Sequence, residues 1–429
     1  MILKNKLNNV LLGCIGDDFT GSSDAASFLA KEGIKTLLFN GIPKDNEELE
    51  DCAAIVIALK TRNVAPSKAS KDTLQAMKWL EKQGIEQYYI KYCSTFDSTP
   101  KGNIGPDIDA ALENYNIPYT VLCPSLPVNK RVVKNGILIV DGKPIAEGHM
   151  AHHPLNPIWA SEISALMRDQ GKYECLVLNE QIMNEKKEEI LSVVNNFAKN
   201  HKHFYVIPEY ATDEQGKKIV DVFGDLKLLT GGSGLLEFLA DKYTQLYDCV
   251  EGDHEPTSVK GKGIALSGSC STATCAQCNK YSSGKPSIAI YPEKLLTGEQ
   301  SAEKVWNVVK KYPEQEFLIY SAGATDPKSR QYSTKEREME ASNVLETTMA
   351  QIARYAYNDG YTRIICAGGE TSGAIALELG FDAFIIGQSI APGVPVLTPL
   401  HNKNIRVVMK SGNFGQDDFF DRAFNITRD

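Results

Sequence analysis

Residues 10–33, VLLGCIGDDFTGSSDAASFLAKEG, contain the unit from which the fold can be predicted. The apolar run at 10–15 is typical of a buried strand. After a polar turn, GSSDAASFLAKEG has apolar residues at helical spacing and a glycine just past its end. The next apolar run, KTLLF at 35–39, is a second strand candidate. A strand, a helix and a strand in this order predict a parallel sheet with the helix packed against it.

The same alternation continues to about residue 250. A helical pattern covers SKDTLQAMKWLEKQG, and a further helix is predicted over 184–200. The other strand candidates are AAIVIAL (53–59), QYYIK (87–91), YTVLC (119–123), ILIV (137–140), ECLVLN (174–179), HFYVIP (203–208) and the start of LLTGGSGLLEFLADKY. Repeated strand–helix–strand units predict a mostly parallel sheet covered by helices on both faces.

The polar segment CVEGDHEPTSVKGKG (249–263) is typical of an interdomain linker, because it contains proline and several glycines. A long helix is predicted over 336–358. Strand candidates resume with GIALS (263–267), SIAIY (287–291), FLIYS (317–321), RIICA (363–367), FIIG (384–387) and IRVVM (405–409). We therefore predict two α/β domains, residues 1–250 and 262–429, each a mostly parallel sheet flanked by helices, which suits a chain of 429 residues.

Composition narrows the class of function. A net charge of −8 argues against non-specific binding to nucleic acids or anionic membranes. The N-terminal apolar run is short and ends in two aspartates, so we expect a soluble chain with no signal peptide or transmembrane segment. Ten scattered cysteines are then expected to be reduced thiols in the cytoplasm. The CxxC formed by Cys275 and Cys278 lacks a second ligand pair, so we interpret both as helix residues rather than metal ligands.

Polar residues follow two strands of the first predicted domain. In open α/β sheets, ligands bind beyond the carboxyl ends of the strands. KYCSTFDSTPKGNIG (91–105) begins at such an end, and Asp17 and Asp18 follow the first strand. A carboxylate there can accept a proton from a substrate hydroxyl, although capping of a helix is the common alternative. The candidate catalytic residues are Asp18, Asp17 and Asp97.

Cationic side chains gather at the same predicted edge, where a carboxylate substrate would bind. A solvated surface position is the usual alternative for such residues. In GHMAHHPLNP, two adjacent histidines suit hydrogen bonding to the substrate better than metal binding, because no partner ligand has clear spacing. The candidate substrate-binding residues are Lys60, Arg62, Lys91, Ser94, Lys101, Asn103, Arg131, His152 and His153.

Three turns of the second predicted domain combine glycines with hydroxyl residues at a strand–helix junction. They are ALSGSCSTATCAQ (265–277), ICAGGETSGAIALELG (365–380) and VMKSGNFGQDDFF (408–420). Glycine lets the backbone approach a ligand, and free N–H groups at a helix start attract phosphate. Together they suggest a nucleotide site, although each alone could be an ordinary tight turn. The P-loop pattern and the G-x-G-x-x-G dinucleotide fingerprint are both absent from the sequence.

With these turns in view, the chain resembles the four-carbon acid sugar kinase family. The matching stretches run in order along nearly the whole sequence. They are GDDFTGSSD, ALKTR, KYCSTFDSTPKGNIGP, CPSLPVNKR, MAHHPLNP, TGGSGL, SGSCSTAT, AGGETSGA, APGVPV and KSGNFGQDDFF. KYCSTFDSTPKGNIGP and HHPLNP resemble the branch that acts on oxo-tetronates. The chain departs from the family at Gly16, where alanine is common, and at VNKR (128–131), where relatives often have ENGR.

The resemblance implies a sugar-acid-binding domain, a nucleotide-binding domain and an active site in the cleft between them. It implies ATP-dependent phosphorylation of the C4 hydroxyl of a 3-oxo four-carbon acid. We expect Mg²⁺ to be carried with ATP, and we hypothesise a contact through water to Glu370. No metal site of the protein's own is predicted. The candidate ATP-binding residues are Ser267, Gly268, Ser269, Gly368, Gly369, Glu370, Thr371, Gly412, Asn413 and Gly415.

On this hypothesis Lys91, Arg62 and Arg131 hold the substrate's carboxylate and oxo group, and Asp18 accepts the C4 proton. The expected partners are a sugar acid and ATP, and a homo-oligomer stays open. A threonate or erythronate kinase of the same family is the first alternative. A sugar-acid dehydrogenase and a non-catalytic sugar-acid sensor are alternatives of other classes; the missing dinucleotide fingerprint argues against the former, and the glycine-rich turns argue against the latter.

Overall fold

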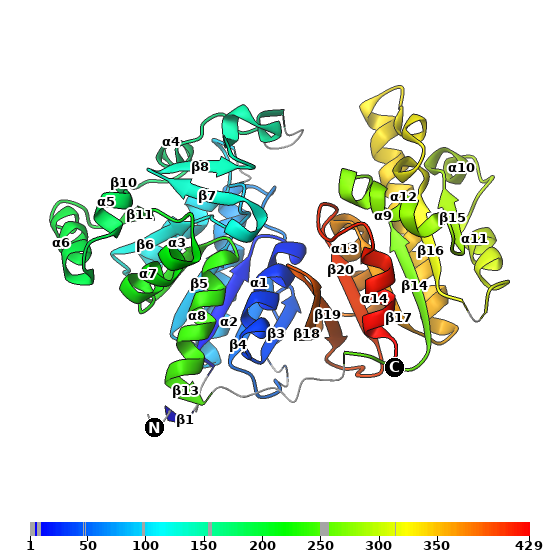
Figure 1. The fold of residues 1–429 in the computed structure, drawn as a ribbon, viewed down its shortest axis with the longest axis horizontal. Coiled ribbons are helices and arrows are strands. Elements are labelled where there is room, and N and C mark those ends of the chain that lie inside the picture. Colours follow the sequence, from blue (N-terminus) through cyan, green and yellow to red (C-terminus); the bar gives the residue numbers. More distant parts are fainter. Residues whose placement is uncertain are drawn as a thin grey trace. The chain divides into compact units, whose positions relative to one another are not determined.

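The computed structural model describes residues 5–6, 10–45, 47, 49–96, 99–152, 157–248, 257–313 and 315–429. Backbone contacts divide the chain into two compact units, Met1–Gly252 and Asp253–Asp429 (Figure 1). The first half of the predicted linker, 249–256, lies outside the described residues. Within the described part of the chain, no helix combines the length and the apolar character needed to cross a membrane. Both units are of the predicted α/β class.

The first unit is built on a parallel sheet with the strand order β10-β11-β6-β12-β5-β2-β4-β3. Its strands are β2 (Leu12–Gly16), β3 (Thr36–Asn40), β4 (Ala54–Ala58), β5 (Gln87–Lys91), β6 (Tyr119–Cys123), β10 (Cys175–Leu178), β11 (Phe204–Pro208) and β12 (Leu228–Gly231). A short parallel pair joins β1 (Asn5–Lys6) to β13 (Tyr247–Asp248). Every residue of the central strands β2 and β4 is buried, which explains their continuous apolar runs.

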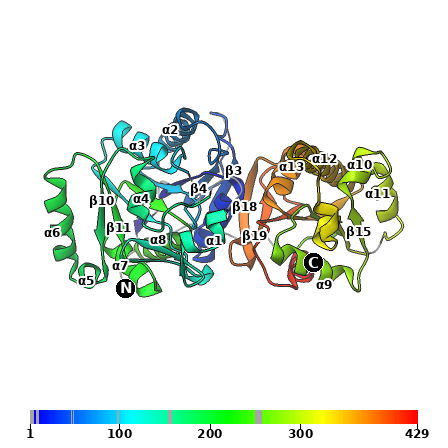
Figure 2. The ribbon, with the colours of Figure 1, turned by 90° about the horizontal axis from the view of Figure 1, so that it is seen from above.

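Helices cover both faces of this sheet. Figure 2 shows α2 and α3 on one face and α1, α7 and α8 on the other. The helices are α1 (Phe19–Lys31), α2 (Pro66–Lys82), α3 (Ile104–Asn114), α4 (Ile163–Arg168), α5 (Glu180–Met183), α6 (Lys187–Ala198), α7 (Asp213–Phe223) and α8 (Gly234–Leu246). Three single 3₁₀ turns, η1 (Pro127–Asn129), η2 (Ile145–Glu147) and η3 (His149–His152), lie between β6 and α4.

One strand prediction needs a correction of its place in the fold. ILIV (137–140) does form a strand, but it lies in a separate antiparallel sheet of β7 (Arg131–Lys134), β8 (Ile137–Val140) and β9 (Lys143–Pro144). The two connections are the dipeptides Asn135–Gly136 and Asp141–Gly142, and all four residues have positive φ angles. Such turns make hairpins, because two residues are too few for the crossover that a parallel strand requires.

The second unit has a sheet with the order β18-β19-β20-β17-β14-β16-β15. Its strands are β14 (Lys262–Ser267), β15 (Ser287–Ile290), β16 (Phe317–Ser321), β17 (Tyr361–Ala367), β18 (Ala383–Ala391), β19 (Val394–Pro399) and β20 (Arg406–Lys410). All pairs from β20 to β15 are parallel, whereas β19 runs antiparallel to both of its neighbours. The predicted FIIG strand is therefore one arm of a hairpin, whose tight turn contains Gly393 at φ 76°.

The helices of the second unit are α9 (Thr272–Ser282), α10 (Pro292–Leu296), α11 (Ala302–Val309), α12 (Lys335–Asn358), α13 (Gly369–Leu379) and α14 (Phe419–Thr427), with 3₁₀ turns η4 (Ala322–Ala324) and η5 (Pro327–Arg330). The predicted long helix agrees with α12. Cys275 and Cys278 both lie within α9, in agreement with their interpretation as helix residues.

Candidate active site

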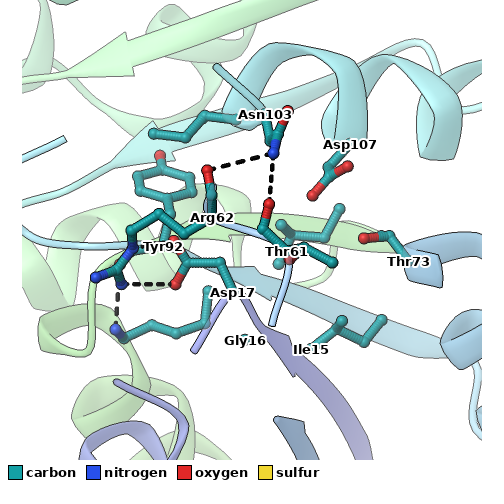
Figure 3. Close-up of a pocket in the computed structure, with 12 residues that line it drawn as sticks. Ile15, Gly16, Asp17, Thr61, Arg62, Thr73, Tyr92, Asn103 and Asp107 are labelled. Atoms are coloured by element: carbon teal, nitrogen blue, oxygen red, sulfur yellow. Dashed lines mark hydrogen bonds and ion pairs between the residues drawn. The ribbon is translucent and has the colours of Figure 1, made fainter. Parts of the chain in front are cut away.

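A small cavity lies beyond the carboxyl ends of β2, β4 and β5 in the first unit (Figure 3). The three ends are level, because Gly16 pairs with both Ala58 and Lys91. The cavity is lined by Ile15, Gly16, Asp17, Thr61, Arg62, Thr73, Ile90, Lys91, Tyr92, Asn103, Ile104 and Asp107. Its volume of about 20 Å³ suits one oxygen-sized group rather than a whole four-carbon acid.

Two carboxylates hold the guanidinium of Arg62. Its Nε donates to Asp17 Oδ2 at 2.8 Å, and its Nη2 donates to Asp17 Oδ1 at 2.9 Å. Its Nη1 lies 3.1 Å from Asp18 Oδ2. Burial lowers the pKa of Arg62, but the charges of Asp17 and Asp18 outweigh that effect and raise it well above its ordinary value. The charge of Arg62 is therefore already balanced, and the bidentate pair fixes both carboxylates at the strand ends.

Asp18 is the more accessible of the two carboxylates. Its side chain is 35% exposed, compared with 13% for Asp17. Asp18 is also the N-cap of α1, because its Oδ1 accepts a hydrogen bond from the backbone N–H of Gly21 at 2.7 Å. The cap and the ion pair hold the carboxylate in one orientation, as a general base requires.

Lys91 is a buried cation at the end of β5. Its ammonium donates to the backbone oxygen of Tyr92 at 3.1 Å. On α1, Asp24 is also buried; burial raises the pKa of this carboxyl, and the charge of Lys91 opposes the shift. Asp24 was missing from the candidates predicted from the sequence. Asp24 could have been found as the third acidic residue of GDDFTGSSD. It follows Asp17 by seven residues, which corresponds to two turns of a helix.

Asn103 joins the N-terminus of α3 to the loop after β4. Its Nδ2 donates to the backbone oxygens of Thr61 and Val64, and it lines the cavity with Arg62 and Lys91. The remaining substrate candidates among the described residues are placed outside the cavity lining. Lys60 and Lys101 are exposed, Ser94 is half-buried, and Arg131 in β7 donates to the backbone oxygen of Asn129. Asp97, His153 and the side chain of His152 lie outside the described part of the structure.

Asp107 lines the same cavity and was also missing from the predicted candidates. It lies in the first turn of α3 and is buried. Burial raises its pKa to about 8; hydrogen bonds with Thr73 and Ser70 oppose this shift, and the charges of Asp17 and Asp72 add to it. The sequence signal was the acidic residue two positions after the KYCSTFDSTPKGNIG stretch.

In the second unit, the three glycine-containing turns meet at the ends of β14, β17 and β20. Ser267 pairs with Ala367, and Ala367 pairs with Lys410. The N–H of Gly268 donates to Ala367 at 3.1 Å, and the N–H of Gly368 donates to Lys410 at 2.9 Å. A Cβ on Gly268 would clash with Thr371, and one on Gly412 would clash with Ser269. The hydroxyl groups of neighbouring turns therefore occupy the space that a side chain at these two positions would need.

Two of these turns contain the N-termini of helices. Helix α13 begins at Gly369, after Gly368 at φ 120°, and Gly369, Glu370 and Asn413 are exposed. Helix α9 begins after its N-cap Ser271, which accepts from the N–H of Thr274 at 3.3 Å. Unpaired N–H groups at the start of a helix suit phosphate.

The other ATP-binding candidates are placed around these helix starts. Thr371 and Ser267 are buried, and Ser267 faces Cys278. Gly415 has a φ angle of 83°, and its backbone oxygen accepts a hydrogen bond from the side chain of Gln277.

Lys410 ties the turns together, and the sequence candidates did not include it. Its side chain is fully buried, and its ammonium donates to Thr274 Oγ1 at 2.9 Å and to the backbone oxygens of Ser411 and Gly412 at 3.1 and 3.0 Å. Burial lowers its pKa to about 8. Lys410 therefore fixes the Gly412 turn against the start of α9.

Comparison with known proteins identifies both units. A family model described as a sugar-binding N-terminal domain matches residues 12–239, and one described as a nucleotide-binding C-terminal domain matches residues 264–420. The chain is 36% identical to the 3-oxo-tetronate kinase of Brucella melitensis, over 98% of this chain and 96% of that protein. It is 38% identical to the 3-oxo-tetronate kinase of Haemophilus influenzae, over 96% and 99%. A crystal structure from Salmonella typhimurium LT2 superposes with a TM-score of 0.85 at 35% identity, covering 97% of this chain and 99% of that one.

Proposed function

The chain belongs to the four-carbon acid sugar kinase family, and we propose that it is an ATP-dependent 3-oxo-tetronate kinase. It transfers the γ-phosphoryl group of ATP to the C4 hydroxyl of a 3-oxo-tetronate and releases ADP. The observation that carries the proposal is an identity of 36–38% with 3-oxo-tetronate kinases over nearly the full length of both chains. A cytoplasmic location, where ATP is available and thiols stay reduced, is part of the proposal.

The first unit provides the groups that bind and activate the acid. Lys91 attracts the substrate carboxylate, because Arg62 is already paired with Asp17 and Asp18. Asp18 accepts the proton of the C4 hydroxyl as that oxygen attacks phosphorus, which suits its exposure and its fixed orientation. Asp17 forms an ion pair with Arg62 and, through Arg62, positions Asp18. Asp97 and the two histidines stay predictions from the sequence.

The second unit provides the phosphate site. The N–H groups at the starts of α9 and α13 and in the Gly412 turn donate to the phosphates of ATP. The close packing of Gly268 and Gly412 supports this role, since it brings the turns after β14, β17 and β20 together at one edge of the sheet. Phosphoryl transfer depends mainly on positioning and on neutralising charge, and these turns supply the positioning.

Mg²⁺ bound with ATP supplies further neutralisation of the phosphoryl charge. Glu370, in the first turn of α13, is the residue proposed to hold a water of that ion. Glu346 on α12 faces it. Burial raises the pKa of Glu346, and the charge of Glu370 raises it further. A cation near the two carboxylates would relieve their repulsion, so the pair fits the proposed role.

An ADP-release assay tests the function across a panel of four-carbon acids with and without the 3-oxo group. We expect Mg²⁺-dependent ADP release that is fastest with a 3-oxo-tetronate. Faster ADP release with threonate or erythronate would instead assign the protein to another branch of the family. A change in NAD(P)H absorbance, or a sugar-acid response without any thermal shift by ATP and Mg²⁺, would overturn the kinase assignment.

A further inference from the structure

Two buried aspartates on helix α3 differ in how their oxygens are satisfied. Asp109 is 1% exposed; one of its oxygens accepts from the hydroxyl of Tyr205, and the other accepts from the N–H of Lys172 at 2.9 Å. Asp107, two positions earlier on the same helix, is 5% exposed, and its Oδ1 has no partner among the described residues. A buried polar atom without a partner destabilises a fold unless a ligand or water satisfies it.

The unpartnered oxygen belongs to a residue that lines the substrate cavity. In Figure 3 the carboxyl of Asp107 lies near Thr61 and Thr73, on the α3 side of the cavity. The cavity has room for one oxygen-sized group, so the substrate can insert one substituent beside Asp107. That substituent cannot be the C4 oxygen, which must stay open to ATP, or the carboxylate, which has two charged oxygens.

The charged groups around the cavity favour the neutral form of Asp107. Asp17 after β2 and Asp72 on α2 are negative, and Arg62 after β4 is already paired with Asp17 and Asp18. Lys91 in β5 is the remaining cation of the lining. Burial raises the pKa of Asp107 to about 8, with Asp17 and Asp72 adding to the shift. At neutral pH the residue is therefore mostly a carboxylic acid, which can donate a hydrogen bond.

We propose that Asp107, as a neutral carboxylic acid, donates a hydrogen bond to the 3-oxo oxygen of the substrate, so that use of the oxo acid, unlike use of its 3-hydroxy counterpart, requires Asp107 to be protonated. The inference rests on the proposed function. A ketone oxygen only accepts hydrogen bonds, so it binds to the acid and is repelled by the carboxylate. A hydroxyl, at C2 or C3, can donate to the carboxylate or accept from the acid, so it needs no particular protonation state.

The test compares kcat/KM for the 3-oxo acid and for the matching 3-hydroxy acid between pH 6.5 and 9.5. For the wild type with the oxo acid, we expect kcat/KM to fall by up to about tenfold per pH unit above pH 8. Asp107→Asn keeps a donor that does not ionise, so it should retain use of the oxo acid with a flatter profile. Asp107→Leu removes the hydrogen bond to either acid, so it should lose about 10- to 100-fold with both near pH 7 and should show no further fall with the oxo acid above pH 8.

Asp109→Asn is the matched control, because it changes a buried carboxyl of the same helix that is absent from the cavity lining. It should keep the wild-type profile and the wild-type ratio of oxo to hydroxy acid. A folded Asp107→Leu variant that keeps the wild-type kcat/KM for the oxo acid near pH 7, or an Asp107→Asn profile that falls as in the wild type, overturns the inference alone. If Asp107→Leu does not fold, the Asp107→Asn profile decides. No ADP release by the wild type with any four-carbon acid overturns the proposed function and this inference with it.

Discussion

In the first unit the strand ends carry charged side chains, whereas the strand ends of the second unit carry glycines and hydroxyl residues. Asp17, Arg62 and Lys91 surround a cavity of about 20 Å³. Gly268 and Gly412 instead pack so tightly that a side chain would clash. A small acid needs charges and hydrogen bonds placed on individual atoms, whereas phosphates can be held by backbone N–H groups. We therefore expect substitutions of charged residues to impair the first site, and substitutions that add volume at a glycine to impair the second.

The largest effect is expected from Asp18→Asn in the first unit. Asparagine can keep the N-cap of α1, but it cannot accept the substrate proton. We expect kcat to fall about 10²- to 10⁴-fold, with the Kd of ATP changed by less than about twofold. Steady-state kinetics and calorimetry with ATP measure the two quantities. Asp45→Asn, at an exposed carboxylate paired with Lys82 at 2.9 Å, is the control. A kcat within tenfold of the wild type would place the base elsewhere.

Gly412→Ala tests the second unit without changing any charge. The new Cβ would clash with the hydroxyl of Ser269 and approach Ser271, so these side chains or the turn itself must shift. Overpacking of this kind costs about 1–3 kcal/mol, which corresponds to about 10- to 100-fold weaker ATP binding. The KM of the sugar acid should stay unchanged. Gly373→Ala in α13, where no described atom lies within 4 Å of the added Cβ, should bind ATP normally. Equal ATP affinity in the two variants would contradict the proposed phosphate site.

A smaller effect, on the pH dependence of stability, is expected from Lys410, which is buried against the glycine-containing turns of the second unit. The pKa of Lys410 is lowered to about 8 in the folded protein, below its ordinary value of about 10.5. Between these values the unfolded chain binds more protons, so the contribution of Lys410 to stability rises with pH, by up to about 1.4 kcal/mol per pH unit. The wild-type Tm should therefore rise relative to that of Lys410→Met between pH 7.5 and 9.5.

The exposed Lys280 on α9 provides the control for this experiment. In Lys280→Met the difference in Tm from the wild type should be the same at both pH values. A Tm difference between wild type and Lys410→Met that stays constant from pH 7.5 to 9.5 would show that the lysine titrates normally despite its burial.

The smallest expected effect separates capping from phosphate binding. Ser271 and Ser301 are both N-caps, of α9 and α11, and each accepts a backbone N–H with its side chain. Alanine at either position should cost about 1 kcal/mol of stability. Only Ser271→Ala should also weaken ATP binding, by a few fold, because Ser271 packs against the Gly412 turn. Thermal unfolding and ATP calorimetry on both variants make the comparison, and equal ATP affinities would remove Ser271 from the site.

Most of the fold could be predicted from apolar runs and helical spacing, because buried parallel strands are apolar throughout. Among the predicted strands the exceptions were ILIV and FIIG, which belong to hairpins, and their partner strands β7 and β19 were not predicted. Their turn dipeptides, Asn135–Gly136 and the Pro–Gly before Val394, are hairpin signals that were visible in the sequence. At these positions the dipeptides predict the observed structure, whereas the alternation of strands and helices does not. In the site, Asp24, Asp107 and Lys410 were missing from the candidates because a single charged residue in a helix or at a strand end is usually solvated.

The sequence by itself determined the strand–helix alternation and the order of the family's motifs, because both depend on residues that are neighbours along the chain. It also placed carboxylates and cations at strand ends. Only the tertiary structure decided which of these groups meet. Arg62 reaches Asp17 across 45 residues, and Lys410 reaches Thr274 across 136. Such pairings follow from strand order and register, and they decide which charges are already balanced, as at Arg62, and which polar atoms, as at Asp107, are left for a ligand.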